Sequence, residues 1–239
     1  MNDTSNASEE RALSGALLKA ALEGDLSAAR DLIERGADVN SIFNKSQGED
    51  VTPLFFASVR GNLDVVELLL EHGAHPDRGY AKNASALGYA AGQGHADVAE
   101  ALLKAGADPN RTAEHVSAPL GFALQNESPD LVAILLEGGA DPNQVFSPED
   151  QRIPPLAAAA ASNRHDAVHL LLEAGAEVDA EDKDNMTALA YTALNGATDI
   201  AETLLDAGAS RTYGHGGIDL ADMARSKGNH SVAQVIERY

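Results

Sequence analysis

The dipeptide Gly-Ala recurs along this chain at a nearly fixed spacing, and this recurrence limits the possible folds more than any other feature. Self-similarity with a period of about 20 to 50 residues indicates an array of stacked supersecondary units. The intervals between successive pairs are 37, 33, 33, 36 and 33 residues, so the common unit has 33 residues, with four extra residues after the first unit and three after the fourth. The pairs begin at Gly36, Gly73, Gly106, Gly139, Gly175 and Gly208.

An amphipathic helix is predicted before each Gly-Ala pair. Before Gly73, for example, apolar pairs stand at 69–70 and, one turn earlier, at 65–66, which places them on one helical stripe that must be buried. The glycine ends the helix, because a left-handed residue there costs a non-Gly side chain about 1–2 kcal/mol. Five of the six units carry an Asp in the first turn, where the helix dipole favours a carboxylate: Asp64, Asp97, Asp130, Asp166 and Asp199.

A second helix is predicted earlier in each unit, and its start is marked by an N-cap and a tolerated proline. Thr52-Pro53-Leu54 is the clearest example, and a small residue, here Ala57, follows four residues after the Pro and permits close helix packing. Scarce aromatics, at 4%, also favour helices over a β-sandwich. The sequence therefore predicts an all-α solenoid of stacked helix–turn–helix units joined by hairpin loops.

A 33-residue unit with these landmarks resembles the ankyrin repeat. The family pattern runs T-P-L-H-x-A, a Gly turn, an apolar pair and then G-A-D-x-N, and the closing motif stands complete at 36–40, 106–110 and 139–143. The resemblance extends from about residue 12 to the C-terminus. The family's His is missing throughout, so we expect stability to depend more on apolar stacking; its place is taken by Leu18, Phe55, Gly88, Gly121, Ala157 and Ala190.

The repeat frame predicts one domain preceded by a tail. Residues 1–11 are polar and acidic, and we expect them to form a disordered tail. The domain covers 12–239, with six full repeats at about 12–44, 45–77, 78–110, 111–143, 144–179 and 180–211 and a short C-terminal cap at 212–239. A cap needs a polar outer face, and this one is rich in charges.

The charge balance bears on the kind of partner. With 37 acidic and 17 basic side chains, the net charge is −20, which disfavours nucleic acid and anionic membranes and would attract a basic protein. The same charge is also explained by solubility alone. The chain has no Cys, no long apolar run and no signal-peptide pattern at its N-terminus, so a cytoplasmic protein is expected. We also expect it to be a monomer.

No motif predicts catalysis, a cofactor or a metal site. A nucleophile elbow, a phosphate-binding loop and a zinc-protease helix are all absent from the sequence. The acidic run at 179–185 lacks the Gly and closing Glu of a calcium loop and is interpreted as a solvated hairpin, and the Gly-rich segment at 213–217 as a loop tip. The eight His residues show no ligand spacing; His72 and His75 are three apart but separated by a helix end.

The resemblance implies a protein-binding surface formed by hairpin tips and the concave groove of the first helices. Two inserted loops, at 41–51 and 144–153, share the pattern of a polar residue, an aliphatic residue and a Phe, and they either pack on the scaffold or meet a partner. A further aromatic stripe, Phe56, Tyr89, Phe122 and Tyr191, fits core or groove-wall packing. The candidate contact residues are Phe43, Arg60, Arg78, Tyr80, Gln93, Arg111, His115, Gln125, Phe146 and Tyr213.

The function that these observations favour is a scaffold for protein–protein interaction. It would act as an adaptor or as a stoichiometric inhibitor, and a basic toxin is one partner that fits the charge. Two alternatives stay open. An enzyme or small-ligand receptor would need convergent polar residues in a groove pocket, and an architectural spacer would self-associate through an exposed end repeat.

Overall fold

The structure is a computed structural model that describes residues 3–45, 49–78, 85–111, 118–126, 128–145, 152–213 and 217–239. Within these ranges the chain forms helix pairs joined by hairpin loops, which confirms the predicted repeat fold. The chain divides into two compact units, Met1–Glu114 and His115–Tyr239, where the sequence predicts one domain over 12–239.

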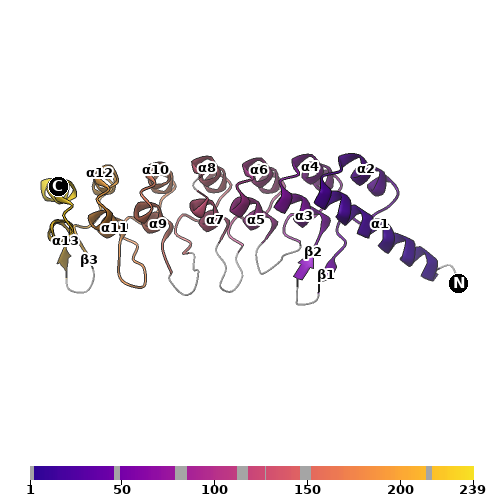
Figure 1. The fold of residues 1–239 in the computed structure, drawn as a ribbon, viewed down its shortest axis with the longest axis horizontal. Coiled ribbons are helices and arrows are strands. Elements are labelled where there is room, and N and C mark those ends of the chain that lie inside the picture. The colour runs from indigo at the N-terminus through magenta and orange to yellow at the C-terminus, as the bar shows by residue number, and fades with distance from the viewer. Residues whose placement is uncertain are drawn as a thin grey trace. The chain divides into compact units, whose positions relative to one another are not determined.

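The described residues of the first unit form three helix pairs. The first helices of the pairs pack against one another in one layer and the second helices in another (Figure 1). A short antiparallel hairpin, β1 (Phe43–Lys45) with β2 (Glu49–Val51), lies between the first and second pairs, with Phe43 opposite Val51. The pairs are α1 (Asp3–Glu23) with α2 (Leu26–Glu34), α3 (Pro53–Arg60) with α4 (Leu63–Glu71), and α5 (Ala86–Gln93) with α6 (Ala96–Lys104).

In the second unit, the residues that the structure describes form four helix pairs in the same two-layer arrangement. Two-residue strands, β3 (Thr212–Tyr213) and β4 (Ile218–Asp219), pair just before the last helices. The segment predicted as a short cap is thus a complete helix pair with a strand pair in front of it. The pairs are α7 (Pro119–Gln125) with α8 (Pro129–Glu137), α9 (Pro155–Ala161) with α10 (His165–Glu173), α11 (Ala188–Asn195) with α12 (Thr198–Asp206), and α13 (Leu220–Ser226) with α14 (His230–Arg238).

The helix ends follow from local residue chemistry. Thr52 caps α3 by accepting a hydrogen bond from the Phe55 N–H at 3.1 Å, as the Thr-Pro motif predicts. At the other end of the pair, Gly73 has φ +83°, and the Ala74 N–H donates to Leu69 O at 2.9 Å, which closes α4. The predicted role of the Gly-Ala pair as a helix terminator is confirmed.

The core of each unit consists of leucine, valine and alanine side chains between the two layers. Leu69 and Leu102 of the second helices are fully buried, as are the small residues Ala57 and Ala90 that face neighbouring helices. Because the alanine side chain is small, the backbones of adjacent first helices can approach closely. The predicted stripes are therefore the buried surface.

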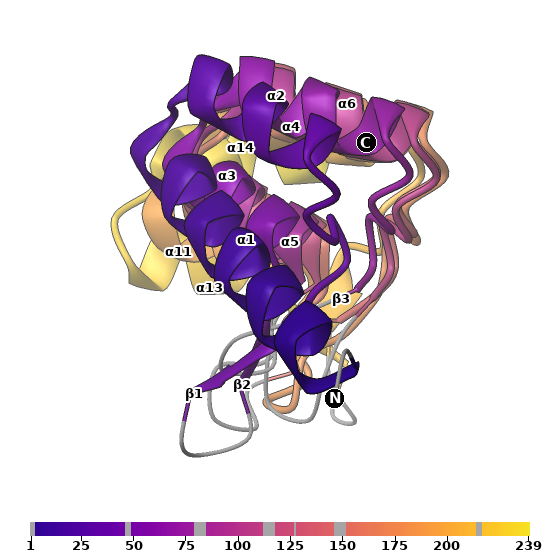
Figure 2. The same cartoon turned by 90° about the vertical axis from the view of Figure 1, so that its right-hand side faces the viewer.

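Helix α1 differs from the sequence prediction. It begins at Asp3 and runs for 21 residues, so residues 3–11 are helical where the polar composition predicts a disordered tail. The other first helices have seven or eight residues. In both Figure 1 and Figure 2, the N-terminal half of α1 extends on the same side of the helix layers as β1 and β2.

Polar side chains at the ends of the Gly-Ala motifs link neighbouring repeats. Asn40 donates to Gly73 O at 2.8 Å and accepts from the His75 N–H at 2.9 Å, and Asn143 makes the same pair of bonds with Gly175 and Glu177. The missing family His led us to expect fewer polar links between repeats. These Asn side chains supply links that the motif alone did not reveal.

Candidate functional site

Three of the predicted contact residues end the first helices. Arg60, Gln93 and Gln125 are the last residues of α3, α5 and α7, and all three are exposed. Because α3 and α5 pack against each other in the first unit, the structure places Arg60 and Gln93 at equivalent positions on adjacent helices. Gln125 belongs to the second unit.

Aromatic rings line the same helices one turn earlier. Phe56 and Tyr89 are half-buried, and both meet the buried ring of Phe55 edge-on, with centroids 5.9 and 5.2 Å from it. Edge-to-face packing of this kind stabilises the contact between α3 and α5. Phe56 and Tyr89 are therefore partly core and partly surface, and the alternative of a groove wall stays a prediction.

Two predicted arginines occupy matching positions in consecutive hairpin loops of the first unit. Arg78 and Arg111 are both exposed, and each follows the closing turn of a repeat. The loops are held together by Asp77, whose carboxylate accepts the Asp108 N–H at 3.1 Å. The two arginines thus belong to neighbouring loops that this hydrogen bond joins.

Phe43 and Tyr213 lie in short strands and are half-buried. The ring of Phe43 is close to α1, where a Cβ added to Gly15 would lie 3.8 Å from Phe43 Cε1. The first inserted loop therefore packs its Phe on the scaffold, while Ile42 before it is 40% exposed. Tyr80, His115 and Phe146 lie outside the described residues. Whether Phe146 of the second inserted loop packs on the scaffold or meets a partner therefore stays a prediction.

A hollow of about 380 Å³ lies between the N-terminal half of α1 and the start of β1. Ser14, at its edge, accepts the Asp38 N–H at 3.3 Å and so ties α1 to the base of the loop. Sequence reasoning did not find this hollow because it depends on the extension of α1. It is lined by Glu10, Arg11, Ser14, Asp38, Ser41, Ile42 and Phe43.

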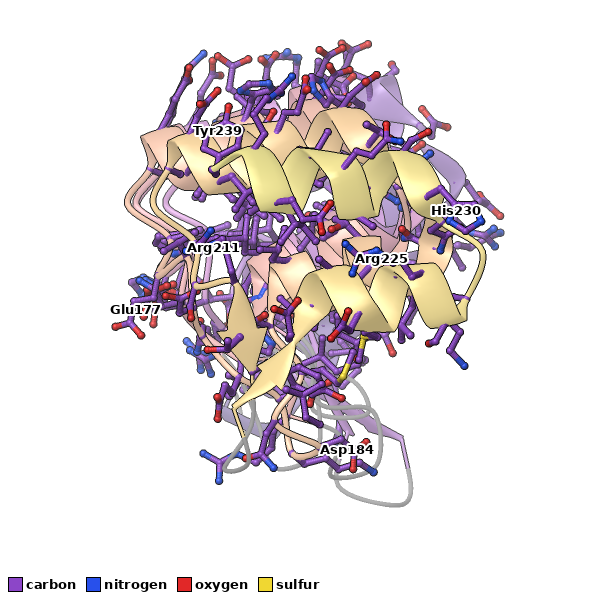
Figure 3. All side chains as sticks on the ribbon, turned by 90° about the vertical axis from the view of Figure 1, so that its left-hand side faces the viewer. Glu177, Asp184, Arg211, Arg225, His230 and Tyr239 are labelled. Carbon is purple, nitrogen blue, oxygen red and sulfur yellow. The ribbon has the colours of Figure 1, made fainter. Side chains whose placement is uncertain are left out.

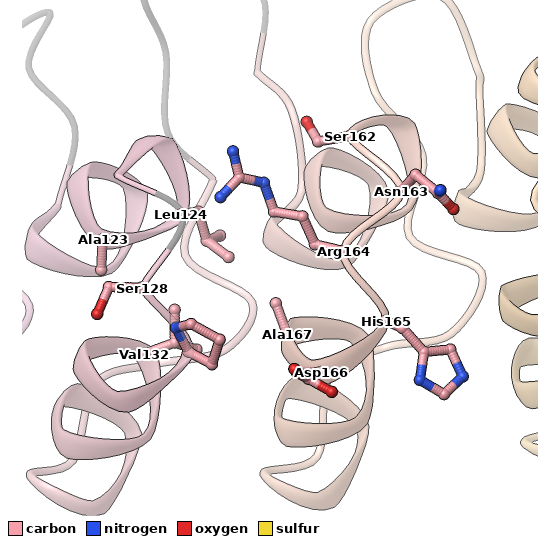
Figure 4. A pocket seen from close by; sticks show the side chains of 11 residues that line it. Ala123, Leu124, Ser128, Val132, Ser162, Asn163, Arg164, His165, Asp166 and Ala167 are labelled. Atoms are coloured by element: carbon pink, nitrogen blue, oxygen red, sulfur yellow. The ribbon is translucent and has the colours of Figure 1, made fainter.

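A second hollow, of about 440 Å³, lies in the second unit between the α7–α8 and α9–α10 pairs (Figure 4). Arg164 extends from the turn before α10 toward Leu124, whereas His165 points away from the gap. Before α14 the matching position is occupied by Asn229, which donates to Ala193 O and Leu194 O at 2.9 Å each.

The acidic run at 179–185 is not wholly solvated, contrary to the prediction. Asp182 is only 8% exposed, and its carboxylate accepts the N–H groups of Asp184 and Met186 and the hydroxyl of Tyr191 at 2.5 Å. Burial and this hydrogen bond raise the pKa of Tyr191 above the usual tyrosine value. The pair fixes the hairpin to α11, which is a structural role.

The C-terminal pair carries the polar outer face expected of a cap. Figure 3 views this end, where Arg225 bridges Asp222 of its own helix and Glu237 of α14. Arg238 also pairs with Glu202 of α12 at 2.7 Å. These exposed ion pairs leave a charged surface at the end of the array.

Two histidines lie closer together than the sequence suggested. His165 and His169, four residues apart on α10, have ring centroids 4.5 Å apart, and this helical spacing was overlooked. Among the described residues, no group of three or more His, Cys, Asp or Glu side chains is arranged to hold a metal ion. No described helix combines the length and apolar character needed to cross a bilayer.

Comparison with known proteins gives consistent results over most of the chain. A family model described as "Ankyrin repeats (3 copies)" matches residues 17–113 and 118–213. The crystal structure of the human ASB11 ankyrin repeat domain is similar with a TM-score of 0.71 and 29% identity, covering 93% of this chain and 96% of that one. The ankyrin repeat domain of Bcl-3, named as a unique member of the IkappaB protein family, gives 0.76 and 27%, covering 92% and 97%.

A curated relative matches over a shorter stretch. The 2-5A-dependent ribonuclease of Mus musculus is 43% identical over 65 residues, which are 26% of this chain. The match covers only 8% of the length of that ribonuclease.

Proposed function

The chain belongs to the ankyrin repeat family, and on that basis we propose that it is a monomeric adaptor or stoichiometric inhibitor that holds one protein partner. Ankyrin repeats are generally modules for protein–protein interaction. The proposed contact surface consists of the exposed ends of the first helices together with the hairpin loops. In the first unit it contains Arg60, Gln93, Arg78 and Arg111.

The observation that carries this proposal is the variation of exposed side chains on a repeated frame. The last residue of the first helix is Arg60 in one repeat and Gln93 in the next, although both helices have the same length and pack in the same way. Half-buried aromatic rings stand one turn away, and aromatic and Arg side chains are frequent anchors of protein interfaces. A rigid scaffold with variable tips suits selective recognition of one partner.

A basic partner is the version of this proposal that the charge supports. The net charge is −20, so the long-range field around the protein would accelerate association with a positively charged partner, as a basic toxin would be. At contact, Arg60, Arg78 and Arg111 would have to face neutral or acidic groups of that partner, because like charges repel. The chain would then act by covering that surface. We propose that this binding takes place in the cytoplasm, because disulfides are rare there and this chain has no Cys to form them.

The proposal is tested by affinity capture followed by a quantitative binding assay on the captured protein. We expect Arg60→Ala with Gln93→Ala to weaken binding of that protein about tenfold, because two exposed anchors on adjacent helices are lost. The matched control is Glu67→Ala, an exposed change on α4, a second helix of the same repeat as Arg60.

The outcome decides between the surface and the wider role. Equal affinity of the double variant and the wild type, with both proteins folded, would remove the first-unit surface from the proposal. Turnover of a small molecule by the purified chain alone would overturn the scaffold role itself.

A further inference from the structure

The hollow between α1 and β1, the α1–β1 hollow, combines an apolar wall with an acidic edge. Ile42 is 40% exposed and Phe43 half-buried, so apolar surface faces solvent beside the hollow. Its volume of about 380 Å³ lies within the range of about 300–1,000 Å³ that is typical of ligand sites. The space is therefore large enough to hold side chains of a bound peptide.

One polar atom in the lining has no partner. Ser41 Oγ is buried and makes no hydrogen bond to any described residue. An unsatisfied buried hydroxyl is unfavourable, and Ser41, which lines the hollow, can redirect its hydroxyl by rotation about the Cα–Cβ bond. A bound backbone N–H or C=O could then satisfy it.

The charges of the lining favour a cationic ligand. The charged residues of the lining are Glu10 and Asp38, both with exposed carboxylates, and Arg11. Two negative charges thus outnumber one positive charge, and the whole chain carries a net charge of −20. An acidic ligand would meet this field unfavourably. A ligand that combines an aliphatic side chain with basic neighbours fits both the wall and the edge.

We propose that the α1–β1 hollow binds a basic segment of the partner protein, seating an aliphatic side chain of that segment against Ile42 and Phe43. The inference rests on the proposed function as a protein-binding scaffold and adds a second contact to the surface of Arg60 and Gln93. The extension of α1 creates the site, because α7, the corresponding helix before the second inserted loop, has only seven residues.

The test measures binding of a fluorescein-labelled peptide of alternating lysine and valine to the full chain by fluorescence anisotropy. We expect Ile42→Ser to weaken binding about fivefold, through the loss of apolar contact. Glu10→Gln should weaken it about twofold, because one exposed charge contributes little. The matched control is Val145→Ser, which removes an aliphatic side chain of the same 40% exposure from the second inserted loop.

Two comparison peptides separate the contributions. An alternating glutamate–valine peptide should not bind, and an alternating lysine–serine peptide should bind at least about fivefold more weakly than lysine–valine. Equal affinities for lysine–valine and lysine–serine, or equal losses in Ile42→Ser and Val145→Ser, would overturn the proposal. If the partner captured by the wild-type chain binds Ile42→Ser normally yet binds Arg60→Ala with Gln93→Ala poorly, the hollow is wrong while the scaffold role stands.

Discussion

At the scale of single residues, Asp182 shows how a carboxylate in an acidic loop becomes part of the scaffold. Its two oxygens accept two backbone N–H groups and the Tyr191 hydroxyl, which joins the hairpin to the first turn of α11. The donor atoms compensate for the loss of water around a nearly buried charge. Tyr191 thus belongs to the aromatic stripe and also holds the neighbouring loop.

Tyr191→Phe should reveal this bond through its pH dependence. At pH 7 we expect the free energy of unfolding to fall by about 1 kcal/mol, since the hydroxyl that satisfies Asp182 is lost. The pKa of Tyr191 is raised in the folded protein, so its contribution is complete below the unfolded pKa of about 10 and declines as pH rises above that value.

Urea unfolding of the wild type and of Tyr191→Phe, followed by circular dichroism, measures the effect. The gap between the two proteins should be constant from about pH 7 to 9 and should shrink toward about pH 11. A gap that stays unchanged up to that pH would show that the hydrogen bond to Asp182 does not raise the pKa of Tyr191 in the folded protein.

At the scale of elements, the second helices end in a way that opposes their own dipoles. Five of the described second helices have an acidic last residue, whereas α6 ends in Lys104 and α14 in Arg238. Because the C-terminus of a helix carries partial negative charge, each exposed carboxylate there costs about 0.3–1 kcal/mol. The acidic last residues are Glu34, Glu71, Glu137, Glu173 and Asp206.

Replacing such residues should stabilise the protein. We expect Glu137→Lys with Glu173→Lys, on the packed helices α8 and α10, to raise the free energy of unfolding by about 1 kcal/mol in total. Glu137→Gln with Glu173→Gln serves as the control and should give about half of that gain, since it only removes the unfavourable charge. No gain in either variant by urea unfolding would show that solvent screens these helix ends completely.

The elements were predictable where the signal is local. Thr52 before Pro53 and the glycine at 73 fix a helix start and a helix end through neighbouring atoms alone, and both were found. The extension of α1 was missed because residues 3–11 have no apolar stripe. The α1–β1 hollow and the burial of Asp182 were missed because they depend on contacts between segments that no short motif encodes.

At the scale of the whole molecule, self-repulsion should limit stability. The net charge of −20 is far from neutral, while ion pairs such as Arg238 with Glu202 are exposed. Exposed pairs contribute about 0–1 kcal/mol each. When salt screens these pairs, the protein therefore loses little stabilisation. Screening the excess of negative charge removes a larger unfavourable energy, because repulsion among many carboxylates acts over distances comparable with the Debye length of about 10 Å at 0.1 M.

We therefore expect added sodium chloride to stabilise this protein. Between about 20 and 300 mM, the free energy of unfolding should rise by about 1 kcal/mol, measured by urea unfolding at pH 7. A variant with Glu71, Glu137 and Glu173 changed to Gln has fewer negative charges and should gain less over the same range. If the free energy of unfolding fell with salt instead, favourable ion pairs would outweigh the repulsion, and the acidic excess could not be a source of instability that a basic partner relieves on binding.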